Sequence, residues 1–258
     1  MILKQDSPVY KKYSRIISIV PSQTELLSYL GLENEVIGIT KFCVHPEKWF
    51  KNKTRVGGTK NINLKVIDQL SPDLIIANKE ENVKEQIEEL AEKYDVWITD
   101  VNDLPGAIKM INDLGKLTHR IERATALASG IKEGFEALKN IISVKRKIPA
   151  AYFIWKNPYM VAAGDTFIND LMQYGGLENI FSEKKRYPQI SLEEIKEKKC
   201  ELILLSSEPF PFKQKHKVEI QKQLPGIKIE LIDGEMFSWY GSRLLKSVDY
   251  FHKFLNNL

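Results

Sequence analysis

A proline-free stretch with helical apolar spacing, near the middle of the chain, sets the strongest limit on the fold. Between Thr118 and Val144 the apolar residues recur three or four positions apart, at Ile121, Ala124, Ala128, Ile131, Phe135, Leu138 and Ile142. This spacing predicts one helix of about 25 residues, roughly 37 Å long at 1.5 Å per residue. A coiled-coil strand is the alternative, but the small alanines favour packing against a globular body. A single stiff helix between two domains would restrict hinge motion.

Short apolar runs alternate with helical stripes on both sides of this helix. The predicted strands are 15–20, 35–39, 73–77 and 96–99 before it, and 150–155, 160–163, 201–205 and 227–232 after it. The predicted helices between them include 25–30, 80–94 and 166–174. Strands that alternate with helices indicate an α/β fold with mainly parallel sheets. We expect an N-terminal lobe over 1–117, the connecting helix over 118–146 and a C-terminal lobe over 147–258.

Two local matches between the halves indicate an internal repeat. The tetrapeptide GLEN occurs at 31–34 and again at 176–179, each time after a predicted helix. The stretch NLKVIDQLSPDLII, from Asn63, matches the apolar pattern of SLEEIKEKKCELIL, from Ser191. Because both matches occur in the same order, we expect two lobes of similar build.

Composition and motif content argue against several functions. The net charge of +4 over 258 residues gives no basic stripe for nucleic acid. The sequence contains no G-x-S-x-G, Walker A, H-E-x-x-H or C-x-x-C motif. The four histidines are scattered, and Cys43 and Cys200 fall in different halves, so neither a bare-metal site nor a disulfide framework is expected. We expect a monomeric binding protein without a cofactor, a catalytic residue or a nucleic-acid partner.

The amino terminus bears on the compartment. Met1 to Tyr13 lacks the apolar core and the small-residue cleavage site of a signal peptide, and no run approaches the ~18 apolar residues of a membrane span. As written, the chain is expected in the cytoplasm. Removal of an export signal would instead place it in the periplasm.

Aromatic residues gather where strands are expected to end. Trp155 and Tyr159 follow a strand of the second half, Tyr187 lies in a loop, and FSWYG, from Phe237, fits neither strand alternation nor a helical stripe. Because ligands bind beyond the carboxyl ends of parallel strands, these rings predict a wide apolar-faced cleft. Rings that only cover sheet edges are the alternative.

The loops after the first strands carry further candidates. His45, in the run Cys43-Val44-His45, is either a surface histidine or a neighbour of the ligand, where its imidazole would donate to a bound metal. The glycines of VGGTK, from Val56, predict a loop of unusual backbone conformation or close ligand approach.

Four stretches carry a resemblance to a known family. They are RIISIVPSQTELLSYLGL, VGGTKNINLKVIDQLSPDLIIA, YGGLENIF followed by YPQISLEEI, and FSWYGSRLL. Together they resemble the class III, helical-backbone periplasmic substrate-binding proteins of ABC importers, in particular the vitamin B12-binding and iron-siderophore-binding members. The resemblance covers nearly the whole chain from Arg15. It implies two Rossmann-like lobes with mainly parallel sheets, joined by a single long backbone helix. It also implies a bulky metal chelate as ligand: a cobalamin or other corrinoid, a ferric siderophore or haem.

The resemblance implies a set of ligand-facing residues at matching positions. They are Pro21, Ser22, Phe42, Thr59, Asn78, Trp155, Tyr187, Glu235 and Trp239. The strand-end loops add His45, Tyr159, Phe237 and Tyr240. Thr59 and Asn78 replace large aromatics of the vitamin B12 binders, which leaves the identity of the chelate open.

The resemblance further implies an ABC permease as partner, contacted by one glutamate on each lobe. Glu193 occupies this place in the second half, whereas Lys65 occupies it in the first and would repel a permease arginine. Asp68 is the nearest acidic substitute. A cytosolic chelate-binding relative without a permease therefore stays open. A nucleotide-using enzyme is less favoured, because Pro21-Ser22-Gln23 stands where a glycine fingerprint would follow the first strand.

Overall fold

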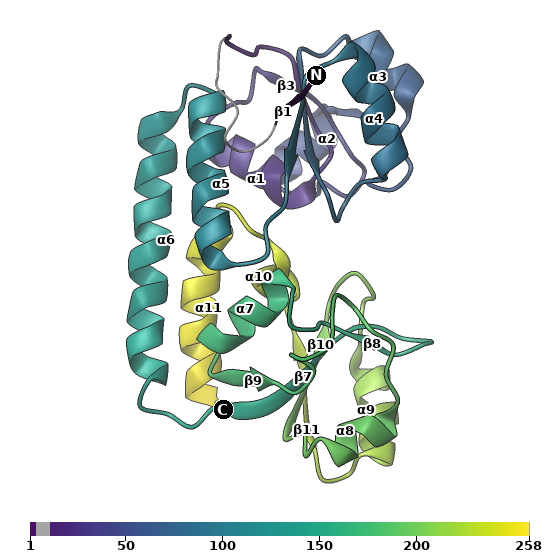
Figure 1. Ribbon diagram of the computed structural model, residues 1–258, viewed down its shortest axis with the longest axis vertical. Coiled ribbons are helices and arrows are strands. Elements are labelled where there is room, and N and C mark those ends of the chain that lie inside the picture. The colour runs from purple at the N-terminus through teal and green to yellow at the C-terminus, as the bar shows by residue number, and fades with distance from the viewer. Residues whose placement is uncertain (4–10, 258) are drawn as a thin grey trace. The chain divides into compact units, whose positions relative to one another are not determined.

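The computed structural model of the protein describes residues 1–3 and 11–257, shown in Figure 1. Within these ranges the chain forms two compact units. Unit 1 comprises residues 1–101, 105–131 and 239–243. Unit 2 comprises residues 102–104, 132–238 and 244–258. The chain thus enters unit 1 a last time, over residues 239–243, between two helices of unit 2.

Unit 1 is built on a six-stranded sheet in which every pair of neighbouring strands is parallel. In spatial order the strands are β1 (Ile2–Leu3), β6 (Val96–Thr99), β5 (Leu74–Asn78), β2 (Ile16–Ser18), β3 (Val36–Ile39) and β4 (Thr54–Arg55). The predicted strands of the first half are confirmed, and β1 and β4 are additional. All residues of β2 and β5 are buried, which explains their continuous apolar runs.

Helices cover the unit 1 sheet. They are α1 (Pro21–Tyr29), α2 (Glu47–Asn52), α3 (Leu64–Leu70), α4 (Lys84–Lys93) and α5 (Leu104–Leu117). Ile67 of α3 and Ile87 and Leu90 of α4 join Ile17 and Ile75 of the strands in one buried apolar cluster. Helix α1 begins at Pro21, earlier than predicted, because proline fits the first helical position.

Unit 2 repeats this plan around a five-stranded sheet. Its strands are β11 (Lys228–Ile232), β10 (Leu202–Ser206), β7 (Ile148–Trp155), β8 (Met160–Val161) and β9 (Leu177–Asn179). All pairs are parallel except β7 with β8. Its helices are α7 (Phe167–Tyr174), α8 (Leu192–Glu197), α9 (Gln214–Gln223), α10 (Glu235–Ser238) and α11 (Leu244–Asn257). The predicted α/β fold with mainly parallel sheets is confirmed.

The long predicted helix is α6 (Ile121–Ile142), whose 22 residues span about 33 Å at 1.5 Å per residue. The boundary between the units falls after Ile131, inside this helix. In unit 1, α6 packs on α5, where a Cβ added at Gly115 would lie 2.2 Å from the Cβ of Ala124. In unit 2, α6 packs on α11, where a Cβ at Gly134 would lie 2.7 Å from Val248. Figure 1 shows α6 beside both helices.

The repeat predicted from the sequence has a structural counterpart. Asn63 caps α3 by accepting the N–H of Val66, and Ser191 caps α8 by accepting the N–H of Glu194. Each helix is followed by a residue with positive φ and then by a buried strand, β5 or β10. The two copies of the tetrapeptide GLEN likewise both begin with a positive-φ glycine after a helix.

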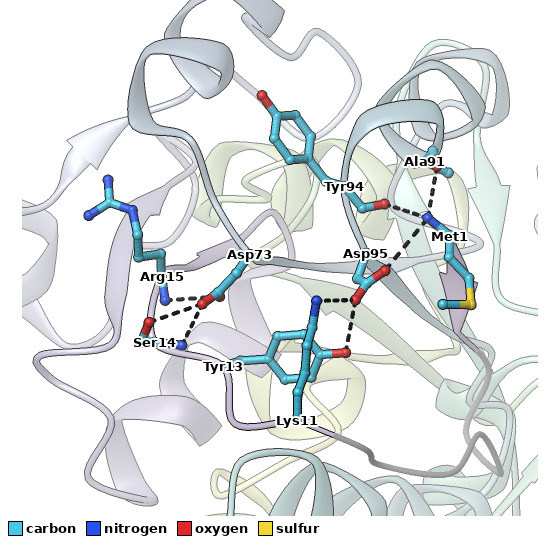
Figure 2. Close-up of polar contacts among 9 residues, drawn as sticks. All are labelled: Met1, Lys11, Tyr13, Ser14, Arg15, Asp73, Ala91, Tyr94 and Asp95. Atoms are coloured by element: carbon cyan, nitrogen blue, oxygen red, sulfur yellow. Dashed lines mark hydrogen bonds and ion pairs between the residues drawn. The ribbon is translucent and has the colours of Figure 1, made fainter.

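The amino edge of the unit 1 sheet is fastened by Asp73, the residue before β5 (Figure 2). Its carboxylate accepts the backbone N–H groups of Ser14 at 2.8 Å and Arg15 at 2.9 Å, and the Ser14 hydroxyl at 3.0 Å. These bonds hold the start of β2 against the start of β5.

Asp95, the residue before β6, holds the preceding part of the chain, around Lys11 and Tyr13, in the same way (Figure 2). Its carboxylate accepts the Tyr13 hydroxyl at 3.1 Å and pairs with the Lys11 ammonium at 2.8 Å. The Met1 ammonium lies nearby and donates to the Tyr94 carbonyl at 2.7 Å. Burial acts to raise the pKa of Asp95, but Lys11, Tyr13 and the Met1 ammonium together lower it.

Candidate functional site

The carboxyl edge of the unit 1 sheet contains a topological switch point. The chain leaves β2 through α1 towards β3 on one side, and leaves β5 through α4 towards β6 on the other. Loops that diverge from neighbouring strands open a crevice at which open α/β sheets bind ligands. Three predicted site residues lie here: Pro21 and Ser22 in the first turn of α1, and Asn78 at the end of β5.

Asn78 organises the loop after β5. Its side-chain nitrogen donates to the carbonyl and hydroxyl oxygens of Thr99, both at 3.1 Å. Its side-chain oxygen accepts the N–H groups of Glu80 at 2.8 Å and Glu81 at 3.1 Å. These contacts engage the whole amide within unit 1, and Asn78 is buried. Its role is therefore to shape the loop, and Asn78 is not part of the proposed site.

Thr59 is also buried, in the loop after β4. Its carbonyl accepts the side-chain amide of Asn82 at 3.1 Å, and the same amide donates to the carbonyl of Ile19 at 3.2 Å. Gly57, two residues earlier, has φ of +101°, as the glycines of this loop predicted. A Cβ there would lie 2.5 Å from the carbonyl oxygen of Asn61, so this turn requires glycine.

The loop after β3 carries Phe42, Cys43 and His45. Phe42 is 51% exposed, with the Lys41 ammonium 5.2 Å from its ring centre. Cys43 is a buried free thiol whose sulfur lies 3.1 Å from the Thr24 hydroxyl. Burial raises the pKa of Cys43, so the thiol stays protonated and serves packing. Cys200 is likewise a free, buried cysteine.

His45 packs against a residue from the other end of the chain. The imidazole and the Trp239 indole meet edge to face, with ring centroids 5.5 Å apart and planes at 71°. On the same indole lies the Arg243 guanidinium, 4.7 Å from the ring centre. Two predicted site residues, His45 and Trp239, are thus brought together inside unit 1.

Residues 239–243 are held on α1 by several further contacts. Arg243 forms a bidentate ion pair with Glu25, with Nε to Oε2 and Nη2 to Oε1 both at 2.9 Å. A Cβ at Gly241 would lie 3.2 Å from the Ser22 carbonyl oxygen. Burial raises the pKa of Tyr240 well above its usual value, the Glu81 carboxylate raises it further, and Ser22 opposes the shift. The Tyr240 phenol therefore stays neutral.

In unit 2, Trp155 ends β7 and is 40% exposed. Its indole lies edge to face with Phe210, at 5.7 Å between centroids. Tyr159, in the turn to β8, packs on Phe153 and is partly exposed. Its carbonyl accepts the N–H of Ile190, so the loop containing Tyr187 runs beside it.

Two further candidates flank α10 in unit 2. Glu235 is partly exposed at the start of α10, where its N–H donates to the Asp233 carboxylate at 3.1 Å. Phe237 has no exposed surface and packs on Tyr152 and Phe251, with centroids 5.3 and 4.8 Å away. A ring enclosed by the core of its own unit has no face for a ligand. We therefore leave Phe237 out of the proposed site.

The predicted docking residues occupy equivalent places in the two units. Glu193 is exposed in the first turn of α8, and Lys65 is exposed in the first turn of α3. Asp68 binds the Lys93 ammonium at 3.0 Å and the Tyr94 hydroxyl at 2.8 Å. These hydrogen bonds lower the pKa of Asp68 and commit its carboxylate to α4 and the residue after it.

Comparison with known proteins assigns these units to a family. The family profile described as periplasmic binding protein matches residues 16–226, most of the chain. The chain belongs to the periplasmic binding protein family. Its members bind substrates without transforming them, so the expectation of a binding protein rather than an enzyme is confirmed. The resemblance predicted from the four sequence motifs is confirmed as well.

Individual members of the periplasmic binding protein family are similar over much of the chain. A vitamin B12-binding protein of Vibrio campbellii is 28% identical over 194 residues, which are 74% of this chain and 70% of that protein. The periplasmic vitamin B12-binding protein of Vibrio cholerae superposes with a TM-score of 0.79, at 21% identity, over 95% of this chain and 97% of that one. A periplasmic haem-binding protein of Pseudomonas aeruginosa superposes with a TM-score of 0.81, at 18% identity, over 93% and 91%.

Two features of the described residues bear on other classes of site. No helix among them has both the length and the apolar character that crossing a membrane requires. Within residues 1–3 and 11–257, no three side chains of the His, Cys, Asp and Glu types gather closely enough to hold a metal ion.

Sequence reasoning missed Glu25 and Arg243, although both lie in motifs that carried the resemblance. Glu25 is the only charged residue of α1, and its neighbours Thr24 and Leu26 are fully buried. A lone charge in such a helix signals a partner, because a buried carboxylate needs one. The partner lies 218 residues away, beyond the reach of any local pattern.

Proposed function

We propose that this chain is the substrate-binding component of an ABC importer, and that its substrate is a bulky metal chelate of corrinoid, haem or ferric-siderophore type. Family membership supports the first part. Relatives that bind vitamin B12 or haem support the second. The lobes 1–117 and 147–258, joined by residues 118–146, are part of the same proposal.

The observation that carries the proposal is a pair of exposed aromatic rings. Phe42 follows β3 and is 51% exposed, and Trp155 ends β7 and is 40% exposed. Both lie at the carboxyl edge of a mainly parallel sheet, where α/β proteins bind ligands. A flat macrocycle offers large apolar faces that such rings can contact. In unit 1 the proposed ligand-facing residues also include Pro21, Ser22, His45, Thr59, Trp239 and Tyr240. In unit 2 they also include Tyr159, Tyr187 and Glu235.

Titration with named chelates tests this proposal. Aquocobalamin, cobinamide, haemin and a ferric hydroxamate are added to the protein while tryptophan fluorescence and melting temperature are followed. We expect one of them to quench the fluorescence and raise the melting temperature. Phe42→Ala and Trp155→Ala should each weaken that binding about tenfold, the loss of ~1.4 kcal/mol of contact. No response to any of the four compounds would contradict the proposal.

Tyr29→Ala is the matched control for these two variants. Tyr29 is a ring 47% exposed, but it ends α1, away from the carboxyl edge of the sheet. Its removal should leave chelate affinity unchanged. An equal loss in all three variants would mean that general surface hydrophobicity, and not the strand-end rings, holds the chelate.

A second candidate function is favoured by the charge at α3. Lys65 is exposed where the family resemblance places a permease-contacting glutamate, and Asp68 is engaged by Lys93 and Tyr94. A chelate carrier that meets no permease would need no acidic residue there. Fractionation of the native protein separates the two functions. Recovery from the periplasm supports the importer component, with Glu193 as its permease contact, and recovery from the cytosol supports the carrier.

A further inference from the structure

Four side chains from three distant parts of the sequence form a continuous series in unit 1. The Glu25 carboxylate binds the Arg243 guanidinium through two hydrogen bonds of 2.9 Å. The guanidinium lies 4.7 Å from the centre of the Trp239 ring. The indole in turn meets the His45 imidazole at 5.5 Å between centroids. Each member therefore constrains the next.

The ion pair between Glu25 and Arg243 is rigid. The Arg243 side chain is 6% exposed and that of Glu25 is 14% exposed, so little water competes for their hydrogen bonds. A bidentate carboxylate fixes the plane of a guanidinium as well as its position, which a lysine ammonium could not reproduce. Glu25 is itself carried by α1, between the fully buried Thr24 and Leu26.

The contact between Arg243 and Trp239 is also tightly constrained. Trp239 and Arg243 belong to the five-residue segment between α10 and α11 that packs in unit 1. Inside this segment Tyr240 is buried, and Gly241 leaves only a close fit against the Ser22 carbonyl oxygen. The indole is thus held from two sides, by its own backbone and by the guanidinium over its face.

We propose that Glu25 and Arg243 are positioning residues for His45, which act by holding the Trp239 ring against the imidazole. An imidazole is a good metal donor, and its orientation is set by the groups that pack on it and bond to it. The inference rests on the proposed function in one respect: the fixed imidazole contacts the bound chelate. The positioning itself is a property of the protein without ligand.

The first experiment therefore uses the ligand-free, full-length protein. Ring-current shift of the His45 imidazole protons by the Trp239 indole is measured by NMR in wild type, Arg243→Met and Glu25→Gln. His45→Gln assigns the signal among the four histidines. We expect most of the upfield or downfield displacement to be lost in both variants. An unchanged His45 signal in a folded Arg243→Met protein would overturn the inference.

Arg120→Met is the matched control. Arg120 pairs with Glu35 at 2.8 Å in unit 1, and both side chains are partly buried, at 28% and 18% exposure. This variant loses an ion pair of the same residue types without touching Trp239. Its melting temperature should fall, whereas its His45 signal should match that of wild type. A displacement of the His45 signal equal to that in Arg243→Met would reduce Arg243 to a general stabilising role.

The second experiment measures binding, with aquocobalamin and haemin as probes. Affinity for the chelate should fall about tenfold in Arg243→Met and Glu25→Gln, because a displaced His45 imidazole no longer meets the metal in the right geometry. Affinity should be unchanged in Arg120→Met. The visible spectrum of the bound metal should also report loss of an axial imidazole. If wild type binds neither probe, the proposed function fails for these chelates while the NMR result still decides the positioning. Tight binding by Arg243→Met with a wild-type spectrum would contradict the inference.

Discussion

Asp73 and Asp95, at the amino edge of the unit 1 sheet, accept hydrogen bonds from the segment that precedes β2 (Figure 2). The carboxyl edge of the same sheet, in contrast, carries amides, hydroxyls and aromatic rings. At the amino edge the charged groups bind neighbouring parts of the same unit. At the carboxyl edge Phe42 is half exposed, and the buried oxygens Gln23 Oε1 and Ser242 Oγ have no hydrogen-bond partner among the described residues.

The difference separates a charged cluster that stabilises the fold from the loops at which a ligand is expected to bind. The cluster of lysine, tyrosine and aspartate around Asp95 resembles a catalytic or binding site. Its contacts, however, join the segment before β2 to the start of β6 and so stabilise the fold. The loops of the carboxyl edge come instead from β2, β3 and β5, which diverge there. Substitutions at the carboxyl edge should therefore affect both stability and chelate affinity, and those at the amino edge should affect stability alone.

Among the substitutions that test this comparison, we expect the largest loss of stability at Gly57, in a loop of the carboxyl edge. Gly57→Ala should lower the free energy of unfolding by about 2 kcal/mol, because φ of +101° strains any residue with a Cβ. The Cβ would also meet the Asn61 carbonyl oxygen at 2.5 Å. The resulting shift of the loop should weaken chelate binding. Urea denaturation and chelate titration check the two effects.

Gly226→Ala is the control for Gly57→Ala. Gly226 has no positive φ, and a Cβ there meets nothing within 4 Å. Its free energy of unfolding should stay within about 0.5 kcal/mol of wild type. If Gly57→Ala is equally harmless, the strained turn that we assign to this edge is wrong.

A smaller effect is expected at the amino edge, from Asp73. Asp73→Ala removes the acceptor for two backbone N–H groups and the Ser14 hydroxyl, and should cost about 1 kcal/mol of stability. Chelate affinity should not change, because Asp73 precedes β5 and Asn78 ends it. A clear loss of affinity in a folded Asp73→Ala protein would break the distinction between the two edges.

The smallest effect concerns Asp95 and pH. Its pKa is lowered in the folded protein, so its stabilising contribution is present above the unfolded pKa of about 4 and is lost as pH falls through the folded value. Asp95→Asn should remove this contribution, worth at most ~1 kcal/mol because Lys11 is half exposed. Its urea midpoint should thus fall less than that of wild type between pH 7 and pH 3. Parallel curves for the two proteins would exclude the role of Asp95.

Much of this fold follows from local pattern. The buried strands β2, β5, β7 and β10 read as apolar runs, and the spacing from Ile121 to Ile142 predicted α6. The strands β1, β4 and β9 were missed because they have only two or three residues each. The equally short β8 was predicted, as part of the longer apolar run 160–163. Ile121, assigned to the apolar face of α6, is 57% exposed, since the packed face begins at Ala124.

The candidate site was less predictable. FSWYG was predicted to be poor core sequence, but its three rings are all buried. Trp239 and Tyr240 are buried in unit 1, and Phe237 is buried in unit 2. Phe237, in the same motif, belongs to the core of unit 2, where it packs on Phe251. Side chains only two residues apart can thus lie in different surroundings, and the sequence alone does not tell which. The pairing of Glu25 with Arg243 depends on the fold alone.

The most direct test of the account is mass spectrometry of the native protein under non-denaturing conditions, isolated from its own cells without added ligand. We predict one bound corrinoid, haem or ferric siderophore per chain, released on unfolding. A protein that is isolated bare, and that takes up none of these chelates when they are supplied in excess, would contradict the account.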